Sequence, residues 1–139
     1  MEKSYIDRYN SFNNSLISLE EAKYRDRTDS FVLSGIVQKF SLTFDLAWKL
    51  MKDILLQEYQ VVDFALGSPS EVLKKSFENN LINDDIWMKM LRQRNQLIHD
   101  YDGTIANESV DDIVDRYIPL FSAFRDKVNK IVQNNKCRE

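Results

Sequence analysis

Hydrophobic residues recur along this chain at intervals of three and four, which is the period of an amphipathic helix. The pattern predicts a first helix over Ser4–Tyr24 and a second helix of about 28 residues that carries the apolar series Leu33–Leu55. The apolar face of the second helix is wide, as expected of the central helix of a bundle. We expect Asp29 or Ser30 to cap its first turn, because short polar side chains accept from free backbone N–H groups there.

The sequence after the second helix predicts first one short helix and then a long one, the fourth. Ser68-Pro69-Ser70-Glu71 is a capping box with proline at the first helical position, and the short helix that it begins ends near Asn79. Asn83 or Asp84 is expected to cap the fourth helix, which continues to the break at Asp102-Gly103.

A last helix is predicted from a cap at Asn107 to about Ile131, with a kink at Pro119, which lacks a backbone donor. The expected fold class is therefore all-α: an antiparallel up-and-down bundle of four long helices plus one short helix. We expect residues 1–139 to form a single domain.

Composition narrows the possible chemistry. The 139 residues include 43% hydrophobic residues but only three glycines and two prolines, too few for a chain that turns every ten residues. One cysteine and one histidine exclude an internal disulfide and any metal site that needs two histidines of one chain, so no metal or cofactor is expected. The net charge of −3 argues against a strongly basic nucleic-acid platform. Neither a signal peptide nor an apolar stretch of 18 residues is recognisable, so we expect a cytoplasmic protein without a membrane partner.

The fourth predicted helix carries a polar set on an apolar stripe. Trp87, Arg94 and Tyr101 are spaced by seven residues, so they fall on nearly one line of a continuous helix. A guanidinium on such a stripe is costly unless it is paired, and Asp45 or another acid of the second helix is a candidate partner. His99 follows Arg94 by five residues and would point roughly 140° away on an unbroken helix.

Arg94 and His99 could therefore act on one ligand in two ways: the helix loosens near His99, or a second copy of the helix faces the first. Arginine offers a planar fork for a phosphate, and histidine titrates near neutrality. The pair suits phosphodiester cleavage in which a ribose 2′-OH attacks its own phosphorus. Asn95 lies on the same flank as His99 and can orient the imidazole or bind a sugar. With one histidine per chain, separate acid and base histidines require a symmetric dimer.

The segment Arg94-Asn95-Gln96-Leu97-Ile98-His99-Asp100-Tyr101 resembles the Arg-x4-His-x-Tyr signature of HEPN domains. It is most similar to the stand-alone nucleotidyltransferase substrate-binding type, which is paired with a minimal nucleotidyltransferase (MNT). The resemblance implies an all-α homodimer with the motif at its interface and an MNT partner. It also implies metal-independent ribonuclease catalysis by Arg94 and His99, support from Asn95, and transfer of AMP to Tyr101.

Other interpretations stay open at this point. Arg94 can be structural, and Tyr101 can be a packed aromatic with a bonded hydroxyl. The chain can be a non-catalytic subunit that binds a nucleotide or a substrate for the partner enzyme, or a dimeric helical scaffold. Lys89 and Arg92 lie beside Arg94, so a local basic patch for RNA or a nucleotide is possible. No phosphate-binding loop or paired-aspartate motif indicates that the chain is itself a nucleotidyltransferase.

Overall fold

The computed structural model describes residues 5–62 and 67–138, so Ser4, where the first helix was predicted to begin, lies outside the described residues. No strand occurs in the described part of the chain, and the prediction of an all-α fold is confirmed. The elements are α1 (Ile6–Glu20), the 3₁₀ helix η1 (Glu21–Tyr24), α2 (Ser30–Gln57), α3 (Pro69–Glu78), α4 (Ile86–Leu97), α5 (Thr104–Asp112), the π-helical segment η2 (Ile113–Tyr117) and α6 (Ile118–Arg138).

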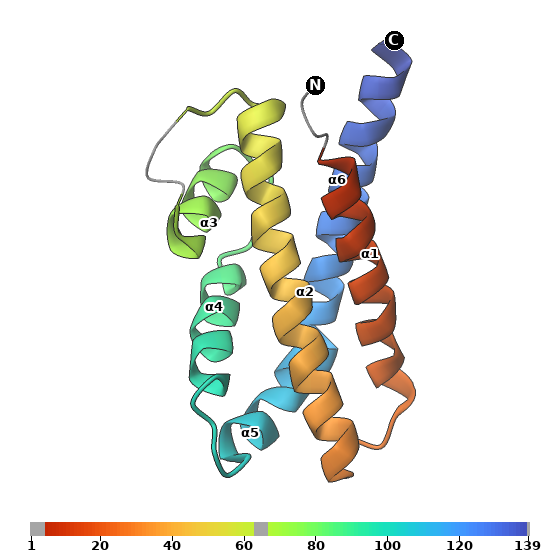
Figure 1. Cartoon of the computed structure of the whole chain (residues 1–139), viewed down its shortest axis with the longest axis vertical. Helices are drawn as coiled ribbons and strands as arrows, with labels where there is room; N and C mark the ends of the chain where they lie inside the picture. The colour runs from red at the N-terminus through yellow and green to blue at the C-terminus, as the bar shows by residue number, and fades with distance from the viewer. Residues whose placement is uncertain (1–4, 63–66, 139) are drawn as a thin grey trace.

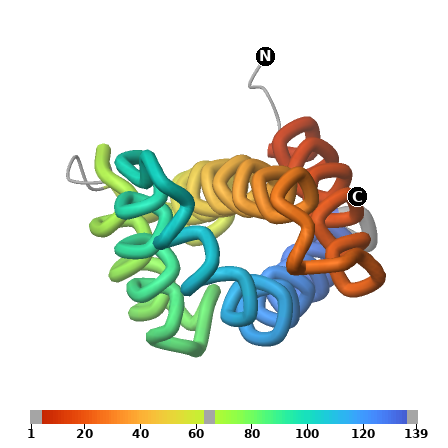
Figure 2. Tube along the Cα trace, turned by 90° about the horizontal axis from the view of Figure 1, so that it is seen from below, coloured from red at the N-terminus to blue at the C-terminus, as the bar shows by residue number. Residues whose placement is uncertain are grey.

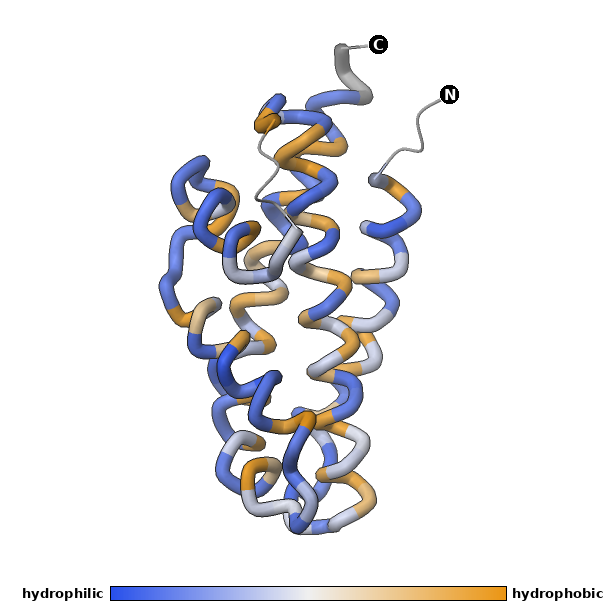
Figure 3. Tube along the Cα trace, turned by 60° about the vertical axis from the view of Figure 1, so that its left-hand side comes forward, coloured by the Kyte–Doolittle hydropathy of each residue, from blue (hydrophilic) through white to orange (hydrophobic). Residues whose placement is uncertain are grey.

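The long helix α2 occupies the centre of the bundle (Figure 1), as the width of its apolar face predicts. It contacts α1, α3, α4 and α5, while α6 packs against α1. Seen from the end, α1, α2, α4 and α6 enclose one core (Figure 2). Hydrophobic and hydrophilic residues alternate along the helices (Figure 3), and each of the helices α1 to α6 contributes buried side chains to one core cluster.

Aromatic side chains from five elements meet in the core. Phe12 of α1 lies edge-on to Phe121 of α6, with ring centroids 6.2 Å apart, and Trp87 of α4 lies 5.4 Å from the same ring. Phe40 of α2 stacks on Tyr117 of η2 at 5.5 Å. These contacts fix the inner face of α4, and with it the position of the polar set that follows Trp87.

Three of the predicted helix caps are present. Asp29 accepts from the backbone N–H of Phe31 at 2.8 Å, and Ser68 accepts from that of Glu71 at 3.3 Å. Asp84 accepts from the first backbone N–H of α4 at 2.9 Å. Short polar side chains therefore set where α2, α3 and α4 begin, as the sequence indicates.

Two boundaries differ from the prediction. The fourth helix ends at Leu97 rather than at Asp102-Gly103, and the last helical stretch begins at Thr104 rather than after a cap at Asn107. Gly103 precedes α5 with φ of 80°, and the predicted cap Asn107 lies inside α5, where its side-chain amide donates to the Gly103 carbonyl at 3.1 Å. From Thr104 onward α5, η2 and α6 follow one another without a break.

The predicted kink at Pro119 takes the form of a wide helical turn. The π-helical segment η2 lies directly before Ile118-Pro119, and α5 runs in a different direction from α6 (Figure 1). A π turn relieves the clash of a proline ring with the carbonyl of the preceding turn. The helix α5 therefore lies below the lower end of α4 and is not in line with α6 (Figure 1).

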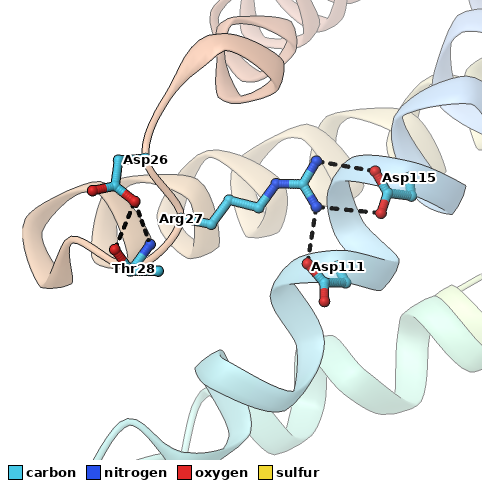
Figure 4. A network of polar contacts seen from close by, with 5 residues as sticks. All are labelled: Asp26, Arg27, Thr28, Asp111 and Asp115. Carbon is cyan, nitrogen blue, oxygen red and sulfur yellow. Dashed lines mark hydrogen bonds and ion pairs between the residues drawn. The ribbon is translucent and has the colours of Figure 1, made fainter.

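Arg27, in the connection between η1 and α2, ties that connection to α5 and η2, which are more than 80 residues away in the sequence (Figure 4). Its guanidinium donates to Asp111 at 2.9 Å and to both carboxylate oxygens of Asp115, at 3.0 and 3.2 Å. The hydrogen bonds from Arg27 lower the pKa of Asp115 below its usual value. Asp26 is occupied separately, since it accepts from the hydroxyl and the backbone N–H of Thr28.

A search of the described helices for a span that could cross a lipid bilayer finds none of sufficient length and hydropathy.

Candidate functional site

The polar set predicted on one helix is divided between the end of α4 and the loop that follows it. The backbone N–H of His99 donates to Gln96 at 3.1 Å, and that of Asp100 donates to Leu97 at 3.2 Å. These bonds span three residues instead of four, which marks a helix tightening at its end. The helix thus stops before His99, and the 140° separation expected on an unbroken helix does not apply.

The loop is shaped by two aspartates: Asp102, which the sequence marked as part of a helix break, and Asp100, to which the sequence analysis gave no role. The carboxylate of Asp100 accepts from the backbone N–H groups of Ile105 at 3.1 Å and Ala106 at 2.9 Å. Asp102 accepts from Thr104 N–H at 3.0 Å, and this bond lowers the pKa of Asp102. The signal available in the sequence is the cluster of aspartates before Gly103, since Asp and Gly favour turns.

Arg94 lies between α4 and α2 with its side chain only 16% exposed. Its Nη2 is 3.5 Å from Oδ1 of Asp45, and its guanidinium carbon is 5.5 Å from the ring centroid of Phe44. Its Nε is buried without a hydrogen-bond partner among the described residues. The Asp45 partner is the one that the sequence suggested for a structural arginine, so Arg94 is at least held in place by α2.

The other predicted site residues are exposed. Asn95 and His99 both face solvent, and Tyr101 is 94% exposed in the loop between α4 and α5. Tyr101 is therefore not a packed core aromatic in this chain, which contradicts that alternative. Ile98, between them in sequence, is also 61% exposed. The contacts of the described residues include none that joins Arg94, His99 and Tyr101 to one another.

The inner flank of α4 carries two polar contacts that the sequence did not reveal. The Tyr117 hydroxyl donates to the side-chain carbonyl of Gln93, and burial raises the pKa of Tyr117 to about 12. One turn earlier, Lys89 pairs with Asp112 at 3.4 Å. Lys89 is therefore engaged by the α5 side of the bundle, which weakens the expected basic patch around Arg94.

The arrangement offers a guanidinium, an imidazole, a carboxamide and a phenol around one helix end. These groups can bind a phosphate, move a proton and accept a transferred group. Within the described residues, no group of three or more His, Cys, Asp and Glu side chains is placed to hold a metal ion.

Comparison with known proteins identifies one family. The family model described as "Nucleotidyltransferase substrate binding protein like" matches residues 7–130, which include α1 through most of α6 and the whole of the Arg94–Tyr101 segment. A search of curated proteins returned no match.

Proposed function

The chain belongs to the nucleotidyltransferase substrate-binding-like family, and we propose that it is the HEPN-type subunit of a pair with a minimal nucleotidyltransferase. In this proposal two copies form a homodimer in the cytoplasm, and the pair acts as toxin and antitoxin. The carrying observation is Tyr101, 94% exposed in the loop between α4 and α5, two residues after His99. A partner enzyme can reach this hydroxyl without unfolding any part of the bundle.

Tyr101 is the proposed acceptor of AMP. Its phenol oxygen attacks the α-phosphorus of ATP, the bond from that phosphorus to the pyrophosphate oxygen breaks, and the phenol proton passes to a base of the partner enzyme. The product carries a phosphodiester beside His99. Such a group would occupy the place of a substrate phosphate and add negative charge there, so transfer would silence the site.

The acceptor is tested by incubating the purified chain with its minimal nucleotidyltransferase and ATP and recording intact mass. We expect the mass to rise by one adenylate per chain in the wild type and not in Tyr101→Phe. Tyr24→Phe is the matched control, because Tyr24 is 87% exposed but lies on η1, away from the motif. Transfer to Tyr101→Phe as fast as to the wild type would remove Tyr101 as the acceptor.

The activity that this transfer would control is metal-independent RNA cleavage. His99 of one copy takes the proton of a ribose 2′-OH, the 2′-oxygen attacks the adjacent phosphorus, and the bond to the 5′-oxygen breaks. Protonated His99 of the second copy supplies the proton to the leaving 5′-oxygen, and Arg94 stabilises the charge on the phosphoryl oxygens. The products are a 2′,3′-cyclic phosphate and a 5′-hydroxyl.

Cleavage is tested with labelled single-stranded RNA in the presence of EDTA. His99→Ala is expected to lower the rate by about 10²–10⁴-fold, the usual contribution of a positioned acid or base. Arg94→Gln is expected to lower it as well, whereas Arg25→Gln, which removes an exposed charge on the η1 side, is expected to keep it. Equal rates for the wild type and His99→Ala would exclude this mechanism.

A second function, that of a non-catalytic subunit that binds a nucleotide or substrate for the partner enzyme, is favoured by the position of Arg94. An arginine tied to Asp45 and Phe44 is oriented by its own chain and is suited to hold a ligand phosphate without turnover. Titration calorimetry with ATP, with and without the partner enzyme, distinguishes the two functions. The binding function would be favoured if ATP binding depends on Arg94 and no RNA is cleaved in the presence of EDTA.

A further inference from the structure

A cationic hollow lies on the surface where α1 meets the upper half of α2. It has a volume of about 350 Å³ and is lined by Arg8 of α1 and by Trp48, Lys49, Lys52 and Asp53 of α2. None of these residues belongs to the Arg94–Tyr101 segment, and the family resemblance assigns no role to them.

The hollow carries an excess of positive charge. Arg8 Nε donates to Asp53 Oδ2 at 2.7 Å, so the single acid of the hollow is already neutralised. Lys49 and Lys52 form no ion pair with any acid in the part of the chain that the structure describes, and Lys49 Nζ lies 5.9 Å from the Trp48 ring centroid. Two lysines without an ion pair in one concavity, beside a single acid that is already neutralised, favour an anionic ligand.

Trp48, which lines the hollow, also carries an unsatisfied hydrogen-bond donor. Its indole Nε1 is buried and has no acceptor among the described residues. A buried N–H without a partner is unfavourable, and indole can donate but not accept. The lining itself therefore offers two ammonium groups, Lys49 and Lys52, which match the oxygens of a phosphate.

The two lysines of the hollow share a stripe of α2 with Asp45, the residue that pairs with Arg94 of α4. Asp45, the partner of Arg94, precedes Lys49 by four residues and Lys52 by seven, so the three lie on one stripe of the helix. At 1.5 Å per residue, Lys52 lies about 10 Å from Asp45 along the axis. One extended polyanion can therefore touch the hollow and the Arg94 region at the same time.

We propose that the Arg8–Lys49–Lys52 hollow is a phosphate-binding subsite that holds the backbone of the RNA whose cleavage is proposed at Arg94 and His99. The inference rests on that proposed function. A nucleoside triphosphate used by the partner enzyme carries the same phosphate chemistry. RNA is favoured because its phosphates repeat at intervals along the strand, so the hollow and Arg94 can each hold a separate phosphate, whereas the phosphates of a nucleoside triphosphate are contiguous.

The experiment measures fluorescence anisotropy of a labelled single-stranded RNA of about ten nucleotides, at several salt concentrations, with the full chain. The His99→Ala chain is used as the background, so that the RNA stays intact. Adding Lys49→Gln and Lys52→Gln is expected to weaken binding about tenfold and to reduce the slope of log affinity against log salt by about 1.4, or about 0.7 for each lost phosphate contact. The matched control is Lys127→Gln with Lys130→Gln, which removes the same charge from α6.

Loss of affinity in both double variants alike, or in neither, would overturn the subsite. Binding of ATP that depends on Lys49 and Lys52, without such dependence for RNA, would overturn its assignment to RNA. The proposed ribonuclease is read separately from cleavage rates. If His99→Ala cleaves as fast as the wild type while RNA affinity still depends on the two lysines, the catalytic proposal fails and the subsite stands.

Discussion

At the scale of single residues, Arg94 is held in one orientation, but not all of its N–H donors have a partner. A guanidinium has five N–H donors, and Arg94 makes one long ion pair with Asp45 at 3.5 Å while its Nε remains buried without a partner. The Phe44 ring covers one side of it. A side chain placed in this way by α2 retains donors for a phosphate, so its structural pair and its proposed role in the site are compatible.

The contribution of the Asp45 contact is measurable as stability. Asp45→Asn keeps the shape of the side chain but removes the charge that faces a mostly buried guanidinium. Because Asp45 itself is 38% exposed, we expect the free energy of unfolding to fall by only about 1 kcal/mol, as measured in urea. The control Asp126→Asn, an exposed acid of α6, is expected to change it by less than about 0.5 kcal/mol. If both variants unfold alike, Asp45 does not hold Arg94.

The surroundings of Arg94 were easier to predict from the sequence than those of Tyr101. The partner of Arg94 was predictable, because a charge on an apolar stripe needs an acid on the facing helix. The exposure of Tyr101 was not, because its alignment with Trp87 presumed a helix that continues through His99. The end of that helix depends on Asp100, whose carboxylate binds N–H groups five and six residues away, a distance that periodicity does not register.

At the scale of elements, the loop between α4 and α5 depends on one glycine. Gly103 has φ of 80°, a conformation that residues with a Cβ adopt at a cost. No heavy atom lies within 4 Å of a Cβ added there, so the backbone alone sets the preference for glycine. The loop holds both His99 and Tyr101, and its geometry is therefore sensitive to this position.

Two alanine substitutions separate backbone strain from packing. Gly103→Ala is expected to lower the free energy of unfolding by about 1 kcal/mol, because of its positive φ. Gly35→Ala, inside α2 and equally free of contacts, is expected to raise it by about 0.5–1 kcal/mol through helix propensity. Chemical denaturation measures both. A stabilising effect of Gly103→Ala would contradict the strain argument.

The contact of Arg27 with Asp115, which holds the connection between η1 and α2, should make the stability of the fold depend on pH. Arg27 lowers the pKa of Asp115, so the folded state binds this proton less readily than the unfolded state. The contribution to stability is therefore present above the unfolded pKa of about 4 and is lost as the pH falls through the folded pKa. Arg27→Gln is expected to be less stable than the wild type at pH 7, and the difference should shrink below about pH 4.

Thermal unfolding of the wild type and Arg27→Gln across pH 2–7 tests this expectation. Arg25→Gln is the matched control, since the Arg25–Glu21 pair is exposed on both sides and lies within η1 and its cap. A difference between Arg27→Gln and the wild type that stays constant down to pH 2 would mean that the Asp115 contact is not its source.

The elements were largely predictable because their signals are local. The caps at Asp29 and Ser68 are encoded within three residues of the bonds that they make. The predicted cap at Asn107 was wrong because the competing arrangement, with Gly103 before α5, relies on Asp100 in the preceding loop. From the sequence, the π-helical segment η2 could be predicted only as a kink at Pro119, because the wider turn depends on how the residues before Pro119 pack.

At the scale of the whole molecule, the single histidine ties the proposed chemistry to the assembly. Cleavage by a 2′-OH needs a proton acceptor and a proton donor, and one chain supplies one imidazole. The exposed end of α4, with Ile98 61% exposed beside Asn95 and His99, leaves this helix end available to a second copy. A symmetric dimer would bring two His99 side chains toward one cleft.

Mixing experiments reveal whether the two copies share one site. Wild type and His99→Ala are co-refolded at equal amounts, so that random pairing gives about a quarter wild-type dimers and half mixed dimers. If each cleavage needs both imidazoles, RNA cleavage should fall to about a quarter of that of the same total amount of wild type, because mixed dimers are inactive. Independent sites in each chain would instead leave about half. A linear dependence of the rate on the wild-type fraction would therefore contradict the shared cleft, whereas a quadratic dependence requires it.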